Sequence, residues 1–377
     1  MLKLQRFVVA AGILLASGAA SATECSSAIS QYNFYIGLGF PENAAEVLAS
    51  HPECFGSSSN TAAASLAIQS TTLGQMQTVS SALGSRFGQV SAPPGRVADA
   101  GGIRGVAAGN PPGKWNAWAS VSENDVRYDR GVFFFNAANR TNKFDSRIRN
   151  LVVGGDYQWA PNLAFGVSGA FDESRGSTES YAIAAPTAPK SVTGNGYSIA
   201  PYIGWQFAKD WAMDATIGWG EGESTVDGAV TTDSKRFFYG ANVGYTTWQG
   251  NWQLTGKGSY LFGQEKSDDS KNNGVTLANS KVTNEVGQFR VGGQAAYWMD
   301  GVMPYVGLTY AVDRLSGTAT AAQRNATEMG KSAWIWSLGA NFVSIKNAIT
   351  GGIGYEYETA RSRSKNSKLM ANINLRF

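Results

Sequence analysis

The fold class is decided by a stretch of alternating side chains, GYSIAPYIGWQF at residues 196–207. Its odd-numbered positions, from Tyr197 to Phe207, are nearly all large and apolar, whereas most of its even-numbered positions are small or polar. Successive side chains of a β-strand point to opposite faces, so this order predicts a strand with one apolar face. The same order recurs along the chain, at 151–159, 211–219, 252–262 and 334–342. An all-β protein is therefore expected.

The composition favours a sheet that meets lipid through alternate residues. Of the 377 residues, 45 are glycine and 11 are tryptophan, whereas only 16% are charged. Beyond residue 22 there is no run of about 18 apolar residues, which excludes a membrane-spanning helix. The net charge of +3 lacks the basic excess of a nucleic-acid-binding protein. A membrane β-barrel explains this combination, because only every second residue of its strands faces the bilayer.

Twelve alternating segments follow Lys114, and the connectors between them alternate in length. The segments lie at 115–122, 148–159, 162–172, 196–207, 211–221, 235–248, 251–263, 283–298, 302–313, 332–344, 347–358 and 366–377. Long polar connectors are expected at 123–147, 173–195, 222–234, 264–282, 314–331 and 359–365. Short periplasmic turns and long external loops are typical of outer-membrane barrels, and an even strand number leaves no unpaired edge in hydrocarbon. We predict a 12-stranded antiparallel transmembrane β-barrel over 114–377, preceded by a short helical N-terminal region.

The first residues have the pattern of a secretory signal. Lys3 and Arg6 precede a short apolar run, and the small residues that follow predict cleavage between Ala22 and Thr23, which makes 1–22 a signal peptide. The mature chain is then expected outside the cytoplasm.

A small head is expected at 23–59, after the signal. Cys25 and Cys54 are the only cysteines, and in an oxidising compartment they are expected to form a disulfide. In the chain-entropy model, closing a loop of this length contributes roughly 3–4 kcal/mol. His51, the only histidine, is interpreted as an ordinary loop residue.

Two further segments separate this head from the barrel. Apolar residues at three- and four-residue steps, ending at Phe87, predict an amphipathic helix within 60–90, and 60–85 carries no charge. Residues 91–113 form a Gly/Pro linker that marks a domain boundary.

The barrel sequence offers little for catalysis. With the single histidine outside it, histidine-dependent hydrolysis and a zinc site are both excluded, and no cofactor fingerprint occurs. We therefore expect no enzyme activity, no cofactor and no metal.

Charged residues on the expected inner face are the candidate pore-lining groups. They are Asp156, Asp214, Lys257, Arg290 and Glu356, together with Arg149, Lys368 and Arg376. They would hold an inserted segment or set ion selectivity; alternatively, they are only the polar lining that any hydrated lumen requires. A basic cluster, Arg361, Arg363, Lys365 and Lys368, is expected either to contact lipopolysaccharide or to be a solvated loop.

Residues 114–377 resemble the autotransporter β-domain, the translocator of type V secretion. The resemblance is carried by the opening WNAWAS at 115–120, the strand pair within 151–171, the stretch 196–205 and the terminal NINLRF at 372–377. Ile373, Leu375 and Phe377 in that terminus resemble the signal by which the barrel-assembly machinery recognises outer-membrane proteins. The resemblance implies a barrel that anchors or exports an N-terminal passenger, with either the helix or the linker in its lumen.

This passenger would be unusually short, because only 23–59 precedes the helix. The expected function is a translocator and anchor for that segment in the outer membrane of a Gram-negative bacterium, with loops at the cell surface. The alternatives are a channel for small solutes and a surface adhesin acting through its loops. Expected partners are outer-membrane lipid and lipopolysaccharide, with the Sec translocon and the barrel-assembly machinery during biogenesis; the barrel is expected to be monomeric and to bind no nucleic acid.

Overall fold

The computed structural model describes most of the barrel and parts of what precedes it. The described residues are 31, 34–35, 43, 46–47, 71–84, 87, 114–132, 140–179, 189–276, 280–317, 331–344, 348–361 and 364–377. The chain divides into a smaller unit, 1–62 with 319–326, and a larger unit, 63–318 with 327–377. The expected signal peptide, the cleavage site at Ala22 and Thr23, Cys25, Cys54, His51 and the linker 91–113 lie outside the described residues.

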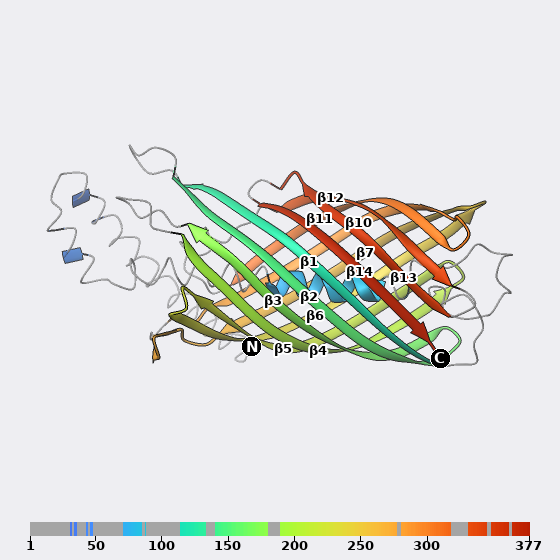
Figure 1. The fold of residues 1–377 in the computed structure, drawn as a ribbon, viewed down its shortest axis with the longest axis horizontal. Coiled ribbons are helices and arrows are strands. Elements are labelled where there is room, and N and C mark those ends of the chain that lie inside the picture. Colours follow the sequence, from blue (N-terminus) through green and yellow to red (C-terminus); the bar gives the residue numbers. More distant parts are fainter. Residues whose placement is uncertain are drawn as a thin grey trace, which may run out of the picture. The chain divides into compact units, whose positions relative to one another are not determined.

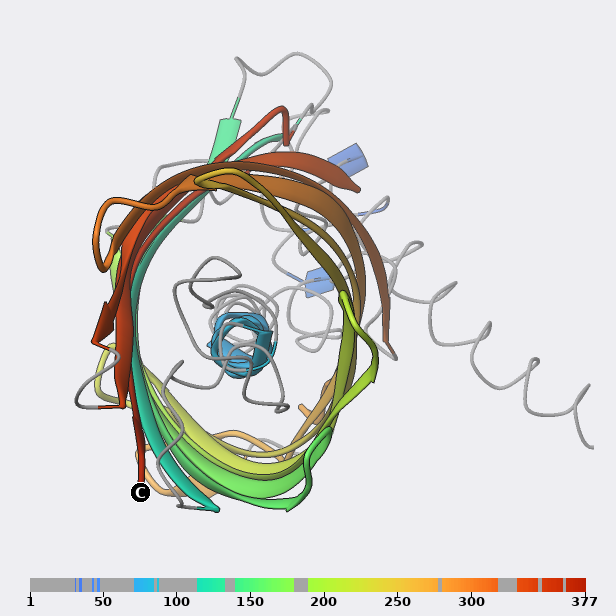
Figure 2. The same ribbon diagram turned by 90° about the vertical axis from the view of Figure 1, so that its right-hand side faces the viewer.

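Twelve long antiparallel strands close into a barrel, as predicted (Figures 1 and 2). They are β1 (Trp115–Val132), β2 (Arg140–Ala160), β3 (Leu163–Glu179), β4 (Lys190–Ala208), β5 (Trp211–Val226), β6 (Val230–Gln249), β7 (Trp252–Ser267), β10 (Thr283–Tyr297), β11 (Val302–Gly317), β12 (Ser332–Ser344), β13 (Ile349–Thr359) and β14 (Ser364–Arg376). The ring is closed by β1 and β14, which pair from Asn116 with Arg376 to Tyr128 with Ser364. No long strand is left with a free edge, as a sheet in hydrocarbon requires.

A small hairpin accompanies the ring without belonging to it. It consists of β8 (Lys271–Asn272) and β9 (Val275–Thr276), both in the connector between β7 and β10. β8 pairs with Val230 and Thr231 of β6.

The two ends of the barrel differ in their connectors. Short turns join the strands at one end, here called the turn end, where Trp115 and Phe377 also lie, paired through two backbone hydrogen bonds of 3.1 and 3.0 Å. The opposite end is here called the loop end. Its strands extend much farther than the sequence predicted: β1 and β2 span most of 123–147, and β5 and β6 are joined by 227–229 alone.

The sequence did not predict these extensions, because the outward-facing side chains change from apolar to charged while the strand continues. The outer face of β1 passes from Val121 to Glu123, Asp125 and Arg127, so the apolar alternation ends although the pairing with β2 does not. The expected long connectors at 123–147, 173–195 and 222–234 were therefore wrong in extent.

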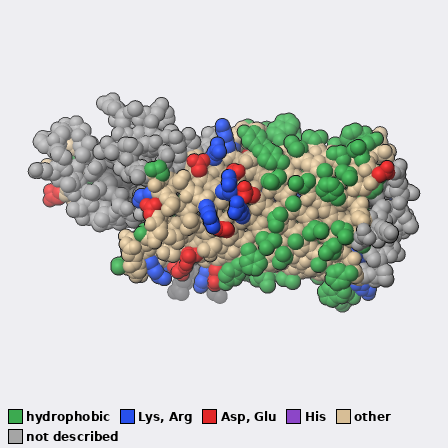
Figure 3. Space-filling model, in the orientation of Figure 1, with side chains coloured by type: hydrophobic (Ala, Val, Ile, Leu, Met, Phe, Trp, Pro, Cys, Tyr) green, Lys and Arg blue, Asp and Glu red, His purple; other side chains and the backbone are tan. Residues whose placement is uncertain are grey.

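The outer wall carries an apolar belt with aromatic residues toward each of its edges (Figure 3). Toward the turn end, exposed tryptophans are Trp115, Trp159, Trp205, Trp211 and Trp252; toward the loop end they are Trp219, Trp334 and Trp336. Such girdles are typical of the two interfaces of a membrane-spanning barrel. Beyond the belt, charged side chains gather toward the loop end, on the left of Figure 3.

A helix over residues 71–84 lies inside this barrel, where Figures 1 and 2 show it as a coil surrounded by strands. Among the helical residues that the structure describes, none forms a stretch long and apolar enough to cross a bilayer.

Candidate functional site

The candidate site is the barrel lumen, which the helix at 71–84 occupies. Thr72 near its start donates a hydrogen bond to Glu265, close to the loop end of β7. Phe87, the last helical residue that the structure describes, packs against Tyr202 in the part of β4 nearer the turn end, with ring centroids 6.1 Å apart. The helix therefore runs from the loop end toward the turn end. The sequence left open whether helix or linker fills the lumen, and the structure places this helix there.

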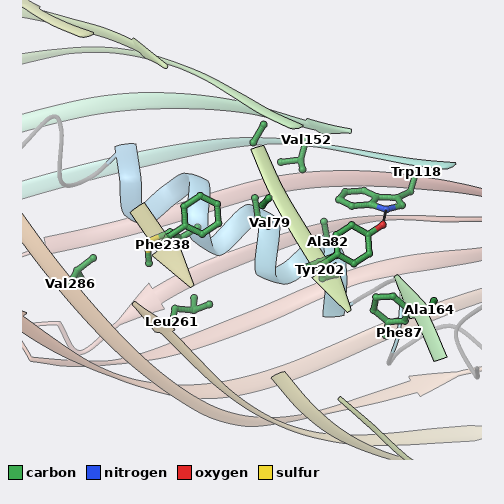
Figure 4. Close-up of a cluster of buried hydrophobic side chains, with 14 residues drawn as sticks. Val79, Ala82, Phe87, Trp118, Val152, Ala164, Tyr202, Phe238, Leu261 and Val286 are labelled. Atoms are coloured by element: carbon green, nitrogen blue, oxygen red, sulfur yellow. Dashed lines mark hydrogen bonds between the residues drawn. The ribbon is translucent and has the colours of Figure 1, made fainter. Parts of the chain in front are cut away.

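The apolar face of the helix packs against the barrel wall. Met76, Val79, Leu83 and Phe87 are all at most 1% exposed, and they are residues whose spacing predicted an amphipathic helix. Figure 4 shows Val79 and Phe87 among apolar residues that point inward from the strands. The wall residues of this cluster include Trp118, Val152, Tyr202, Phe238, Leu261 and Val286. Burying a large apolar side chain contributes roughly 1.5–3 kcal/mol, so this face alone holds the helix firmly.

The polar face of the helix is hydrogen-bonded to the wall. The bonds join Gln75 to Asp172 at 2.8 Å, Thr78 to Ser122 at 2.9 Å, Ser80 to Asn242 at 3.0 Å and Gln77 to Gln288 at 3.2 Å. Because the described helix carries only neutral side chains, it fills the lumen without burying a charge of its own. The absence of charge in this segment, visible in the sequence, thus has a structural reason.

Two glycines of the wall make room for helix side chains. A Cβ at Gly204 of β4 would overlap the ring of Phe87, and one at Gly263 of β7 would overlap the sulfur of Met76. A larger residue at Gly204 would displace the ring of Phe87, and one at Gly263 would force the end of the Met76 side chain to move. These glycines therefore contribute to the shape of the seat and are not only strand residues.

Two glycines of the helix make room for wall side chains in return. A Cβ at Gly74 would lie 2.9 Å from the amide nitrogen of Asn124 on β1, and one at Gly84 would overlap the Lys257 ammonium group on β7. Helix and wall are thus shaped to each other at four separate points along the lumen.

A buried ion cluster lies beside the first turns of the helix. Arg236 Nη1 is 2.5 Å from Asp172 Oδ1, and Arg236 Nε is 3.0 Å from Glu265 Oε1. All three side chains are at most 3% exposed. The two carboxylates also accept the hydrogen bonds from Gln75 and Thr72. This cluster therefore joins β3, β6 and β7 to the helix, and removing its single cation would leave two buried charges unpaired.

The predicted pore-lining residue Asp156 supports the far end of the helix. Its carboxylate accepts hydrogen bonds from the Tyr202 hydroxyl at 3.0 Å and from the Asn116 amide at 3.2 Å. The Trp118 indole N–H donates to the same Tyr202 oxygen at 2.7 Å, as the dashed line in Figure 4 shows. Asp156 therefore orients the aromatic side chains on which Phe87 rests.

The other four predicted residues also lie on the inner face. Asp214 is buried and accepts a hydrogen bond from Asn242 at 2.6 Å. Lys257, Arg290 and Glu356 line a cavity of about 120 Å³ between the helix and the wall. The structure thus brings three of the predicted residues together, while Asp156 and Asp214 belong to separate hydrogen-bonded groups.

Other charged residues are not where the sequence suggested. Arg149 was expected inside but is on the outer face, 2.8 Å from Glu123 of the neighbouring strand, because inward positions of β2 are the even-numbered ones. The expected basic cluster is also divided. Arg361 is buried against Asp313 and Glu358, and Lys368 faces the lumen, whereas Lys365 is exposed on the outer face of the same strand as Lys368. Arg363 lies outside the described residues.

Three lumen residues were not predicted from the sequence: Asp172, Arg236 and Glu265. The sequence contained a signal for them. Each occupies one of the alternate positions that face inward in its strand, beyond the part of the strand in which the other positions are apolar. Glu265, for example, lies two residues after Gly263 on β7, in what was expected to be a connector. Within the part of the chain that the structure describes, no group of three or more His, Cys, Asp and Glu side chains is arranged to hold a metal ion.

The sequence of this barrel matches a known family. The model of the autotransporter β-domain matches residues 109–356, more than half of the chain. The chain belongs to the autotransporter β-domain family. Barrels of this family reside in the outer membrane of Gram-negative bacteria and serve type V secretion. No curated protein sequence is significantly similar to the chain.

Solved autotransporter barrels share the fold. The translocator domain of NalP from Neisseria meningitidis aligns with a TM-score of 0.54 and 14% identity, covering 71% of this chain and 90% of that one. The β-domain of Bordetella BrkA has a TM-score of 0.50 and 14% identity, over 70% and 100%. The transport unit of AIDA-I from Escherichia coli has a TM-score of 0.50 and 11% identity, over 80% and 99%. At these identities the likeness shows the fold of this autotransporter barrel and nothing finer.

Proposed function

We propose that this barrel anchors its own N-terminal segment, 23–59, in the outer membrane and displays it at the cell surface. The observation that carries the proposal is the direction of the lumenal helix. Its first residues lie near the loop end, where Thr72 meets Glu265, and its last lie toward the turn end, where β1 begins. The chain preceding residue 71 is therefore joined to the helix on the loop side, which in an outer-membrane barrel faces outward.

The fit between helix and wall supports a retained anchor. Apolar packing, neutral hydrogen bonds and paired glycines hold the helix along the lumen. A porin-like channel, the alternative, needs a continuous aqueous path, whereas among the described residues the helix occupies the lumen and the cavity beside 78–82 measures about 120 Å³. The adhesin alternative is weakened where strands replace expected loops, as at 222–234.

The same proposal includes the route and the partners of the chain. Residues 1–22 would direct it to the Sec translocon, and Ile373, Leu375 and Phe377 would be recognised by the barrel-assembly machinery. All three terminal residues lie on the outer face, between 40 and 65% exposed, where a partner can reach them before the barrel enters lipid and lipopolysaccharide. Since the ring closes through β1 and β14, a single chain suffices.

An accessibility experiment tests the display. An epitope is inserted after Ser57 of the full chain, and antibody binding is compared on intact and on permeabilised cells. Two insertions calibrate it: one at Gly228 in the β5–β6 turn at the loop end, and one at Gly250 in the β6–β7 turn at the turn end. The Gly228 epitope should be accessible on intact cells and the Gly250 epitope only after permeabilisation.

We expect the Ser57 epitope to behave like the Gly228 epitope. If it instead behaves like the Gly250 epitope, the display is refuted. A second measurement addresses the channel. Planar-bilayer conductance should be small for the full chain and should rise on deletion of 60–113; a large conductance of the full chain would favour the channel.

A further inference from the structure

The helix does not engage all sides of the lumen equally. Its hydrogen bonds to the wall reach β1, β3, β6, β7 and, through Gln288, the loop-side part of β10. Its apolar cluster draws on β1 to β4, β6, β7 and Val286 of β10. Within the described residues, neither set includes a side chain from β11, β12, β13 or β14.

The cavity of about 120 Å³ lies on the side of the lumen formed by β11 to β14. Thr78, Ser80 and Ser81 of the helix border it, and the facing wall residues come mainly from β7 and β10 to β14. The charged groups among them are Lys257, Arg290, Lys368 and Glu356. The cavity therefore holds three cationic side chains and one carboxylate.

One cation of this cavity, Lys368, is poorly compensated. Lys368 is only 3% exposed, and its ammonium nitrogen has no hydrogen-bond partner among the described residues. Glu356 lies opposite Lys368 in the strand register but forms no ion pair of 4 Å or less within the described part of the barrel. Asp214 and Lys257 border a second small pocket, so that lysine has a carboxylate nearby. A buried cation without a hydrogen-bonded partner is costly.

A second orphan donor borders the same space. Among the described residues, the buried Nδ2 amide group of Asn341 on β12 has no hydrogen-bond partner, and Asn341 lines the cavity. Hydroxyl groups of the lining, among them Ser81, Ser337 and Thr309, can donate as well. Three cationic side chains, one carboxylate and an amide without a partner among the described residues thus line one polar cavity.

We propose that this lumenal cavity binds a small oxyanion of the sulfate or phosphate type. Lys368, Arg290 and Lys257 supply its charge partners, and Asn341 supplies a neutral donor. The bound anion would also accept from the Ser81 hydroxyl of the helix, because Thr78 and Ser80 already donate to Gly74 and Asn242. It would join the helix to a side of the wall that contributes no side chain to the hydrogen bonds and apolar cluster described above. This site goes beyond the display of the N-terminal segment and stands independently of it.

Calorimetric titration of the folded full chain in detergent tests this proposal. Sodium sulfate, and separately sodium phosphate, is added at constant ionic strength in a buffer that contains neither anion. We expect saturable binding of one anion per barrel. Lys368→Met should weaken binding at least tenfold, whereas Lys365→Met, on the outer face of the same strand, should leave the affinity unchanged.

The folded state of each variant is checked by heat-modifiable gel mobility. Should Lys368→Met fail to fold, Asn341→Ala replaces it, with an expected loss of at least fivefold. Absence of saturable binding to the unmodified chain, or equal binding by the Lys365 and Lys368 variants, would overturn the proposal. Because the assay does not depend on where the N-terminal segment lies, its failure leaves the display untouched.

Discussion

The two sides of the lumen differ in how their side chains face the helix. On β1 to β7, the helix-binding side, the wall is complementary to the helix: Gly204 and Gly263 receive Phe87 and Met76, and the carboxylates of the ion cluster accept from the helix. On β11 to β14, the cavity side, no such complement exists among the described residues, and polar and charged groups face an open volume.

This difference distinguishes two kinds of buried charge in the lumen. Arg236 is neutralised by two acidic side chains and forms part of a packed interface. Lys368, equally buried, has no such partner in the described part of the barrel. The first arrangement is structural, because each charged side chain in it is paired with an opposite charge. The second leaves a buried cation that can bind a further group. Charge on an inner face therefore indicates function only where its partners are missing.

The largest expected effect comes from breaking the ion cluster on the helix-binding side. Arg236→Met leaves Asp172 and Glu265 buried without their cation, so we expect a loss of about 3–5 kcal/mol in the free energy of unfolding. Urea unfolding of the reconstituted barrel measures it. Arg290→Met on the cavity side is the matched change, and it should cost far less because two other cations remain there. Equal losses would erase the distinction between the sides.

A smaller effect should follow from filling one wall glycine. Gly204→Val places methyl groups where the ring of Phe87 lies, and overpacking of this kind costs about 1–3 kcal/mol. We expect partial displacement of the helix, seen as increased single-channel conductance. Gly256→Val is the control, since a Cβ there meets nothing within 4 Å. Adding Phe87→Leu to Gly204→Val should restore part of the loss, and no recovery would contradict a direct contact.

The period-two pattern was enough to predict the barrel itself. Segments such as 196–207 show apolar and small residues on opposite faces, and short turns such as 209–210 mark where strands reverse. What the pattern could not predict was the strand length beyond the membrane. There, as at Glu123 and Arg149, both faces are polar and alternation carries no information, although the backbone pairing continues.

The lumen was predictable in part and for a related reason. The alternation of side chains within each strand identified Asp156, Asp214, Lys257, Arg290 and Glu356 as inner-face residues. It does not specify how far along the barrel axis each residue lies, or which residue of another strand it contacts. The ion cluster joins three strands at positions far apart in sequence, from Asp172 to Glu265. Such a cluster depends on the register between strands and on the seat of the helix, which a single sequence does not specify.

The smallest predicted effect compares two adjacent serines of the helix. Ser80 donates to Asn242 at 3.0 Å on the helix-binding side, whereas Ser81 lines the cavity and has no hydrogen bond within the described part of the chain. Ser80→Ala should lower stability by about 0.5–1.5 kcal/mol through loss of one buried hydrogen bond, and Ser81→Ala should change it less. Urea midpoints in buffer free of sulfate and phosphate measure both. Sulfate is then added. If it raises the urea midpoint of Ser80→Ala more than that of Ser81→Ala, the Ser81 hydroxyl contributes to anion binding. If Ser81→Ala loses more stability than Ser80→Ala in the absence of the anion, the cavity side already holds the helix.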